Sequence, residues 1–373
     1  MTLSLMFKTV SESCNLACDY CYYSSTKGIL KTVKHLDSVK LKKLMADYMS
    51  KTRGVASFIW QGGEPLLAGL EFFEEVISLE VQYAPPNTSI SNAVQTDGTL
   101  INDRFSAFFK KYNFLVGVSL DGPPSIHNSR RVYANGTGSF DKVMNGIKLL
   151  DKHHVSYNIL SVIHEGNVQR LDEIIDFYLR NNLRWIQFLP AMKFRSQDVE
   201  MPATYEITPE QYGQFLCDAF DIWYEQFMEH GRPTFSIRFI DNILSTYIDD
   251  DPGFCMINNK CSDTLIIEQN GDVFPCDFFM GDQWKLGNVG IDDLETMIKS
   301  DKYKDFMRLK PNLPHKCASC KWKSKCYGGC PRNRKYVDGT PDVDFFCGAY
   351  MKFYEYTETR MKYLASMIKK SRI

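Results

Sequence analysis

The sequence lacks the features that mark membrane-spanning, secreted or nucleic-acid-binding proteins. No apolar run in its 373 residues approaches the ~20 that cross a bilayer. The start, MTLSLMFKTV, has neither the basic segment nor the long apolar segment of a secretory signal. The net charge of −1 also gives no excess of Lys and Arg for DNA or RNA. We therefore expect a globular, cytoplasmic protein whose partners include no nucleic acid and no membrane.

The chain does not lack cysteine, because it has twelve. Thiols stay reduced in the cytoplasm, so this number favours metal binding over disulfides. Cys14, Cys18 and Cys21 form a C-x3-C-x2-C triplet without a fourth ligand, and no His lies between Cys21 and His35. A structural zinc site normally closes with four ligands. An iron-sulfur cluster also takes thiolates, and three can hold it while one iron stays open for chemistry.

Eight further cysteines gather toward the C-terminus, and a twelfth, Cys217, stands alone in a stretch with a helical pattern. The eight are Cys255, Cys261, Cys276, Cys317, Cys320, Cys326, Cys330 and Cys347. Eight thiolates complete two four-cysteine cages, but two zinc sites satisfy the same count, so the spacing alone does not name the metal. We expect Cys217 to pack in the core.

Apolar, β-rich runs alternate with helical patterns through the first half of the chain. Strands are predicted at residues 3–10, 56–61, 89–95, 114–120, 156–163 and 184–189. Helices are predicted near residues 38–52, 69–83, 101–112, 139–153 and 167–182. This order predicts an α/β fold with a parallel sheet and right-handed crossovers, which is open or curled into a partial (β/α)6 barrel.

Four short motifs each follow one of the first four predicted strands. They are CNLACDYCYY, GGEP (residues 62–65), QTDG (95–98) and SLDGP (119–123). Each could be an ordinary loop turn, but active sites of such folds lie where several loops converge at the carboxyl ends of the strands. Their shared position therefore predicts one site.

Later signals divide the chain into domains. Thr208, Pro209 and Gln211 predict the capped start of a helix that runs to about Glu229, before Gly231. We place the boundary just after this helix, which gives a barrel domain at 1–232, a cysteine-rich domain at 233–347 and a C-terminal helix at 348–373. There are no internal repeats and no low-complexity tracts.

The cysteine triplet after the first strand, with GGEP after the second, resembles the radical S-adenosylmethionine superfamily over roughly the first 230 residues. In that superfamily three cysteines hold a [4Fe-4S] cluster, and its fourth iron binds the cofactor. The eight later cysteines resemble the SPASM extension, which carries two auxiliary [4Fe-4S] clusters. The resemblance thus implies iron rather than zinc, and three clusters.

Within these proteins the chain is most similar to the anaerobic sulfatase-maturating enzymes. The matching stretches are FKTVSESCNLACDYCYY, QGGEPLLAGLEFFE, QTDGTLI, FLVGVSLDGP with a later IHN, and GDVFPCDFF followed by WKLGN. The resemblance implies that an unfolded sulfatase segment is oxidised at a Cys or Ser to formylglycine without oxygen. It also implies a reduced flavodoxin- or ferredoxin-type electron donor and a monomeric enzyme.

The same resemblance assigns roles to individual residues. Contacts to S-adenosylmethionine are implied for Tyr20, Gly63, Ser119, Arg131 and Met192, although LPAM around Met192 departs from the family pattern. The first auxiliary cluster would be held by Cys255, Cys261, Cys276 and Cys330. The second would be held by Cys317, Cys320, Cys326 and Cys347. Asp277 matches the general base.

The chemistry of the reaction agrees with these roles. Oxidising a Cys or Ser side chain to an aldehyde removes two electrons and two protons, one of them within a hydrogen atom taken from Cβ. A 5′-deoxyadenosyl radical would take that hydrogen atom, a nearby cluster would accept the second electron, and a carboxylate within hydrogen-bond reach would accept the heteroatom proton. Asp277, next to Cys276, suits the last task, although a loop carboxylate can equally be solvated or cap a helix. Arg131 could pair with the cofactor carboxylate, although an Arg-Arg pair is more often solvated surface.

Two other hypotheses stay open. The same superfamily includes peptide-modifying enzymes that form thioether crosslinks or epimerise residues. We expect no peptide-recognition domain before the barrel, because the first strand begins at Leu3, and this disfavours many of those enzymes. An iron-sulfur electron carrier or sensor is the non-enzymatic alternative, but it would leave GGEP and the loop after the fourth strand without a role.

Overall fold

The computed structural model describes residues 3–22, 33–192, 205–248 and 253–371. They divide into two units. One consists of Met1–Ile159 and Asp263–Phe306, and the other of Leu160–Ser262 and Met307–Ile373. The sequence-based boundaries at residues 232 and 347 follow motif content instead of compactness, and they stay a prediction.

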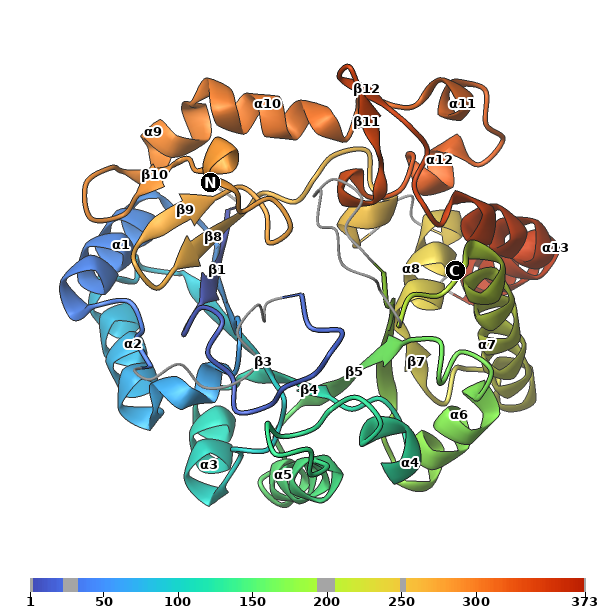
Figure 1. Ribbon diagram of the computed structural model, residues 1–373, viewed down its shortest axis with the longest axis horizontal. Helices are drawn as coiled ribbons and strands as arrows, with labels where there is room; N and C mark the ends of the chain where they lie inside the picture. Colours follow the sequence, from blue (N-terminus) through green and yellow to red (C-terminus); the bar gives the residue numbers. More distant parts are fainter. Residues whose placement is uncertain (1–2, 23–32, 193–204, 249–252, 372–373) are drawn as a thin grey trace. The chain divides into compact units, whose positions relative to one another are not determined.

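The first unit is built on parallel strands. They are β1 (Ser4–Lys8), β2 (Val55–Gln61), β3 (Ser89–Thr96) and β4 (Leu115–Ser119), paired in chain order. The connecting helices are α1 (Ser38–Lys51), α2 (Leu70–Tyr83), α3 (Asp103–Lys111), the short α4 (Pro124–His127) and α5 (Phe140–Lys152). Figure 1 shows α1, α2, α3 and α5 outside these strands. The predicted α/β fold with a parallel sheet is confirmed.

Apolar side chains of the strands and helices make the core of this unit. Phe7 of β1 stacks on Trp60 of β2 with ring centroids 4.3 Å apart, and both side chains are buried. Phe73 of α2 contacts Trp60 edge-on at 5.8 Å. Buried aromatic pairs contribute about 0.5–1.5 kcal/mol beyond the burial of their area. This packing holds the carboxyl ends of β1 and β2 side by side, where the predicted motifs begin.

A later segment, which the sequence patterns did not predict as strands, extends the same sheet. β8 (Thr264–Glu268) pairs parallel with β1, so that Lys8 and Glu268 are register partners. β9 (Asp272–Phe274) and β10 (Gly287–Asn288) continue it antiparallel, and α9 (Leu294–Lys299) follows. Cys276 and Asp277 lie two and three residues after the end of β9, in the same unit as the first three cysteines.

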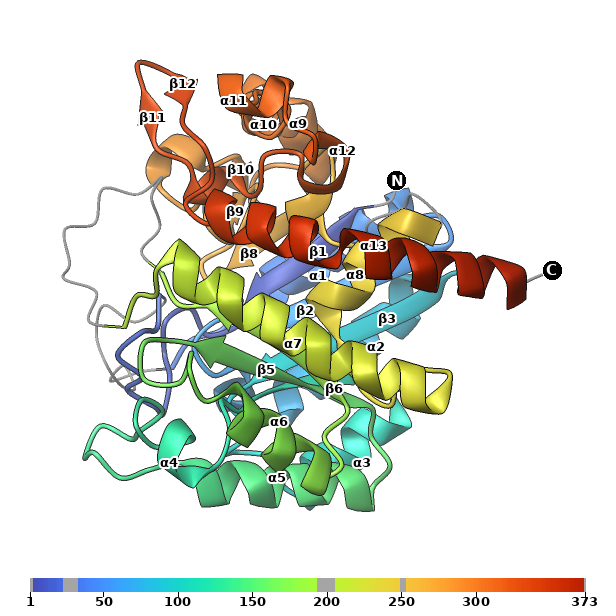
Figure 2. The same cartoon turned by 90° about the vertical axis from the view of Figure 1, so that its right-hand side faces the viewer.

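β5 (Tyr157–Ile163) leads into the second unit. There α6 (Leu171–Arg180) precedes β6 (Trp185–Pro190), which pairs parallel with β7 (Ser236–Ile237), and α8 (Arg238–Ile248) follows. α7 (Pro209–His230) has the predicted capping box at Thr208 and Gln211 and ends at the left-handed Gly231. Figure 2 shows α13 (Cys347–Ser371) running alongside α7.

Short elements lie among the later cysteines of this unit in the sequence. They are the 3-10 turn η2 (Cys255–Ile257), α11 (His315–Ala318), α12 (Lys323–Cys326), the turn η4 (Pro331–Asn333) and the hairpin of β11 (Tyr336–Val337) with β12 (Thr340–Pro341). α10 (Asp301–Leu309) precedes them. No helix in the described ranges is both long and apolar enough to cross a membrane.

Candidate active site

The cysteine triplet lies in the loop that follows β1. The backbone N–H of Leu16 donates to Cys14 Sγ at 3.4 Å, and a turn joins the N–H of Cys21 to the carbonyl of Cys18 at 3.2 Å. All three have free thiols. Burial raises the pKa of Cys18 to about 12 and that of Cys14 further still. Thiols that resist ionisation in this way need a strong cationic partner, such as a metal cluster, to be bound as thiolates.

Gly63 of GGEP lies directly against this loop. Its φ of +52° belongs to the left-handed region, and a Cβ added there would lie 2.0 Å from the carbonyl oxygen of Ser13. The same carbonyl accepts the N–H of Glu64 at 2.8 Å. Only glycine fits this approach. The second motif therefore holds the residue that precedes Cys14.

A buried carboxylate, Asp121 of SLDGP, joins two residues predicted to contact the cofactor. Asp121 is fully buried, and its Oδ2 accepts from the Tyr20 hydroxyl and, at 3.0 Å, from Arg131 Nε. Arg131 also lies over the Tyr20 ring at 5.3 Å. The ion pair explains how Arg131 stays buried, unlike a solvated surface arginine. Asp121 accepts from Nε of Arg131, and a guanidinium has further N–H donors besides this one.

His127 forms hydrogen bonds that hold the segment around Asp121 and Arg131. Burial lowers its pKa to about 4, so it is neutral at pH 7. Its Nδ1 accepts the N–H of Asp121 at 3.4 Å, and its Nε2 lies 2.9 Å from Ser139 Oγ, which itself donates to the Arg131 carbonyl. The ring therefore carries its proton on Nε2.

A second buried acidic group lies between GGEP and QTDG. Glu64 accepts from Thr96 Oγ1 at 2.8 Å and from the N–H of Asp97 at 2.7 Å, while Asp97 accepts from Thr99 and lies 4.0 Å from Cys14 Sγ. Burial and the charge of Asp97 raise the pKa of Glu64. Ser119, at the end of β4, accepts from Gln95 at 3.2 Å. The loops after β2, β3 and β4 are thus joined by hydrogen bonds.

Asp277 forms an ion pair with the buried Lys8 at the end of β1. The Lys8 side chain is 1% exposed and that of Asp277 is 10% exposed. Tyr22, in the cysteine loop, donates its hydroxyl to Asp277 Oδ2 at 2.7 Å, and Lys8 Nζ lies 5.7 Å from its ring centre. Burial lowers the pKa of Lys8, and Asp277 acts against that shift. Asp277 is therefore a largely buried carboxyl group paired with a buried lysine.

Three predicted ligands of the first auxiliary cluster lie in the second unit. Cys255, Cys261 and Cys330 act on one another electrostatically, and burial raises the pKa of Cys255 and brings that of Cys261 to about 12. The fourth, Cys276, belongs to the first unit. Met192 follows β6 in the second unit and is buried. The roles of both stay predictions.

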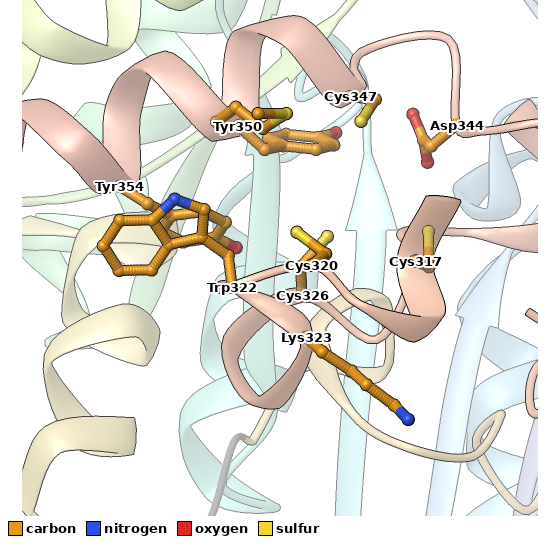
Figure 3. A pocket seen from close by; sticks show the side chains of 11 residues that line it. Cys317, Cys320, Trp322, Lys323, Cys326, Asp344, Cys347, Tyr350 and Tyr354 are labelled. Carbon is orange, nitrogen blue, oxygen red and sulfur yellow. The ribbon is translucent and has the colours of Figure 1, made fainter. Parts of the chain in front are cut away.

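The four predicted ligands of the second auxiliary cluster line one cavity. Figure 3 shows Cys317, Cys320, Cys326 and Cys347 around it, with Asp344 and Tyr350 beside them. Four thiols on one cavity match the donor set of a four-iron cluster. Among the residues that the structure describes, no three His, Cys, Asp or Glu side chains are arranged to hold a single metal ion.

Sequence reasoning missed Lys8 and Asp121. A lysine at an inward-facing position of an apolar strand was the available signal for Lys8, because such a charge is rarely buried without a partner. Asp121 lies within SLDGP, but the sequence alone does not assign it a role. Cys217 lies buried in α7, as expected of a packing cysteine.

Two family models match the chain. The Radical SAM superfamily matches residues 9–178, and an iron-sulfur cluster-binding domain, SPASM, matches residues 255–321. These matches imply iron-sulfur clusters, and they favour iron over zinc for the later cysteines.

Relatives match over nearly the whole chain. A cysteine-type anaerobic sulfatase-maturating enzyme of Clostridium novyi (strain NT) is 34% identical over 98% of this chain and 98% of its own. A serine-type anaerobic sulfatase-maturating enzyme of Bacteroides thetaiotaomicron is also 34% identical, over 97% of this chain and 91% of its own. A solved structure of native anSMEcpe with bound AdoMet and Cp18Cys peptide is 33% identical, covers 98% of this chain and 99% of that chain, and has a TM-score of 0.91.

Proposed function

Because the chain belongs to the anaerobic sulfatase-maturating enzymes of the radical SAM superfamily, we propose that it oxidises a Cys or Ser in a sulfatase polypeptide to Cα-formylglycine without oxygen. It is a radical SAM oxidoreductase. The observation that carries the proposal is the Asp277 carboxyl group, paired with Lys8 and directly following a predicted cluster ligand. Asp277 thereby offers a receiver for the heteroatom proton.

The cysteines divide into three sets of ligands. Cys14, Cys18 and Cys21 hold the catalytic cluster; Cys255, Cys261, Cys276 and Cys330 hold one auxiliary cluster; Cys317, Cys320, Cys326 and Cys347 hold the other. Three [4Fe-4S] clusters fit this family. When bound, the clusters and S-adenosylmethionine supply the one-electron chemistry that removes a Cβ hydrogen atom and accepts the second electron.

The chain's own residues bind and orient the cofactor. The remaining N–H groups of the Arg131 guanidinium would bind the carboxylate of the cofactor. Asp121 holds Arg131 and the Tyr20 hydroxyl in place. Gly63, Ser119 and Met192 complete the proposed contacts. A guanidinium already paired on one edge is pre-oriented, so less side-chain entropy is lost when it binds.

Asp277 takes the proton from the target thiol or hydroxyl. Lys8 pairs with this carboxyl group before the reaction, and the Tyr22 hydroxyl donates to its Oδ2 until a substrate heteroatom can take that place. Tyr22 is 47% exposed, so it can move aside without disturbing the core. A positioned base of this kind contributes about 10²- to 10⁴-fold in rate.

Mass spectrometry of peptides incubated with the reconstituted enzyme tests the proposal. Two sulfatase-derived peptides that differ only in a Cys or Ser at the target position are each incubated with S-adenosylmethionine and a reductant. We expect an aldehyde that reacts with a hydrazide probe on at least one of them. A crosslinked or epimerised peptide without aldehyde would instead favour another radical SAM modification.

The electron donor, the oligomeric state and the cellular location are also part of the proposal. We propose a reduced flavodoxin- or ferredoxin-type protein as the electron donor, a monomeric enzyme and a cytoplasmic location, where twelve free thiols stay reduced. Replacing the chemical reductant by each donor protein, and measuring the molar mass of the reconstituted enzyme in solution, test the first two points.

A further inference from the structure

Two cationic side chains are buried among the later cysteines of the second unit. Lys310 is 1% exposed and Arg334 is fully buried. In the described residues neither forms an ion pair with a carboxylate; their hydrogen-bond partners are backbone carbonyls. A charge buried in this way is costly without a nearby opposite charge. Their surroundings therefore have to supply negative charge.

The carbonyls that bind these cations belong to the cysteine segments. Lys310 Nζ donates to the carbonyl of Met256 at 2.7 Å and to that of Gly329. Met256 follows Cys255, and Gly329 precedes Cys330. The ammonium group is thus anchored next to two proposed ligands of the first auxiliary cluster.

Arg334 holds the short segment that connects the two proposed cluster sites. Its guanidinium donates to the carbonyls of Gly328 at 3.1 Å and Tyr327 at 3.3 Å. Tyr327, Gly328 and Gly329 all have positive φ, of 47°, 72° and 67°. This run of left-handed residues lies between Cys326 and Cys330, and at Tyr327 it is strained. Carbonyl binding by the cations offsets that strain.

The cysteines near Lys310, once bound to a cluster as thiolates, would be the negative partners of these cations. Burial lowers the pKa of Lys310, and Cys330, Cys326 and Cys261 act against that shift. These three belong to both auxiliary sets, so the ammonium lies within the electrostatic range of both. Asp344 is a buried carboxylate of this region, but it accepts from the N–H groups of Cys330 and Phe346.

We propose that Lys310, with Arg334 fixing the segment that binds it, is the buried counter-cation of the two auxiliary clusters and raises their reduction potential. It acts as a positioning residue and does not touch the substrate. A cluster held by four thiolates is negatively charged and becomes more so on reduction. A fixed positive charge therefore favours the reduced form, since net charge and hydrogen bonding set cluster potentials. The inference rests on the cluster ligation proposed above.

The test isolates the auxiliary clusters. In the full-length protein with Cys14, Cys18 and Cys21 replaced by Ala, the auxiliary clusters alone remain to be titrated by electron paramagnetic resonance. Lys310→Met should lower the ratio of reduced to oxidised cluster at a fixed potential at least tenfold, which is a midpoint shift of about 59 mV for a one-electron couple. Lys310→Arg should keep the midpoint. Lys335→Met, which removes an exposed lysine next to Arg334, is the matched control.

Each outcome decides between alternatives. Unchanged midpoints in Lys310→Met, with iron content equal to the control, would overturn the proposal. If Lys310→Met loses iron, the comparison moves to Lys310→Arg. If Lys310→Arg retains its iron, the result supports a requirement for positive charge at this position. If both variants lose iron equally, the proposal is overturned. A background protein that binds zinc in place of about eight irons would refute the proposed ligation itself.

Discussion

Replacing Asp277 by Asn tests whether this largely buried carboxyl group is the catalytic base, and how much it contributes to stability. Asn keeps the shape of the side chain but cannot take a proton at neutral pH. If Asp277 is the base, aldehyde formation should fall by about 10²- to 10⁴-fold, or about 3–5 kcal/mol at 1.36 kcal/mol per tenfold. 5′-Deoxyadenosine should still form, uncoupled from aldehyde. Both products are measured in one tube, with a Cys peptide and a Ser peptide.

The same change also removes the partner of a buried cation. Lys8 is 1% exposed, and breaking a buried pair by removing one member costs about 3–5 kcal/mol. Two features reduce that cost here: burial already lowers the pKa of Lys8, so it can lose its proton, and Glu268 is its register partner on β8. We therefore expect Asp277→Asn to be measurably destabilised in chemical denaturation but still folded.

A double variant distinguishes the two effects. Lys8→Met with Asp277→Asn removes the stranded charge, so its stability should recover above that of Asp277→Asn alone. Its aldehyde yield should stay low, because no base has been restored. The Ser peptide should lose at least as much rate as the Cys peptide, since a hydroxyl is the weaker acid. Aldehyde at the native rate in Asp277→Asn, or recovery of the rate in the double variant, would refute the assignment of the base.

Three further predictions concern the metal content and the pH dependence of stability. Anaerobically reconstituted protein should contain about twelve irons per chain; tightly bound zinc with iron near four would restore the zinc interpretation of the later cysteines. Replacing Cys14, Cys18 and Cys21 together by Ala should abolish 5′-deoxyadenosine formation and leave about eight irons, so persistent cofactor cleavage would contradict the assignment of the triplet. Burial raises the pKa of Glu80 to about 7, so its protonated form stabilises the fold below pH 4.5 and that contribution, about 3 kcal/mol at most, is lost as the pH rises through 7. Glu80→Gln should therefore unfold at higher denaturant than the native protein at pH 8 but not at pH 5, and equal differences at both pH values would contradict the burial of an ionisable group there.

The regular elements of the first half could be predicted because their signals are local. Apolar runs mark β1 to β6, and the pattern Thr208, Pro209, Gln211 marks the start of α7, as the structure confirms. β8 to β10 escaped prediction because β9 and β10 are only three and two residues long, and because tertiary contacts set the pairing of β8 with β1 and of β9 with β8. Strands of that length carry almost no periodic signal.

The parts of the site that escaped prediction depend on contacts between distant segments. Arg131 could have been either a solvated surface residue or a ligand-binding one, and only its burial on Asp121 distinguishes the two. The pairing of Lys8 with Asp277 follows from the docking of β8 and β9 beside β1. Neither contact has a signature in local composition, because Lys8 and Asp277 lie far apart in the sequence and Asp121 and Arg131 lie in one irregular segment after β4.

The position of Asp277 couples two requirements of the proposed oxidation through one short segment. Cys276, a proposed ligand of the electron-accepting cluster, lies two residues after the end of β9, and the next residue is the proposed proton acceptor. The bridge between Cys276 and Phe279 closes a tight turn around Asp277, so the backbone cannot move one residue without the other. Lys8 fixes this turn to β1, from whose end the cysteine triplet also begins. The proposed proton acceptor is therefore held at the end of the strand that carries the loop of the cysteine triplet, so we expect one binding event to bring a polypeptide substrate close to both.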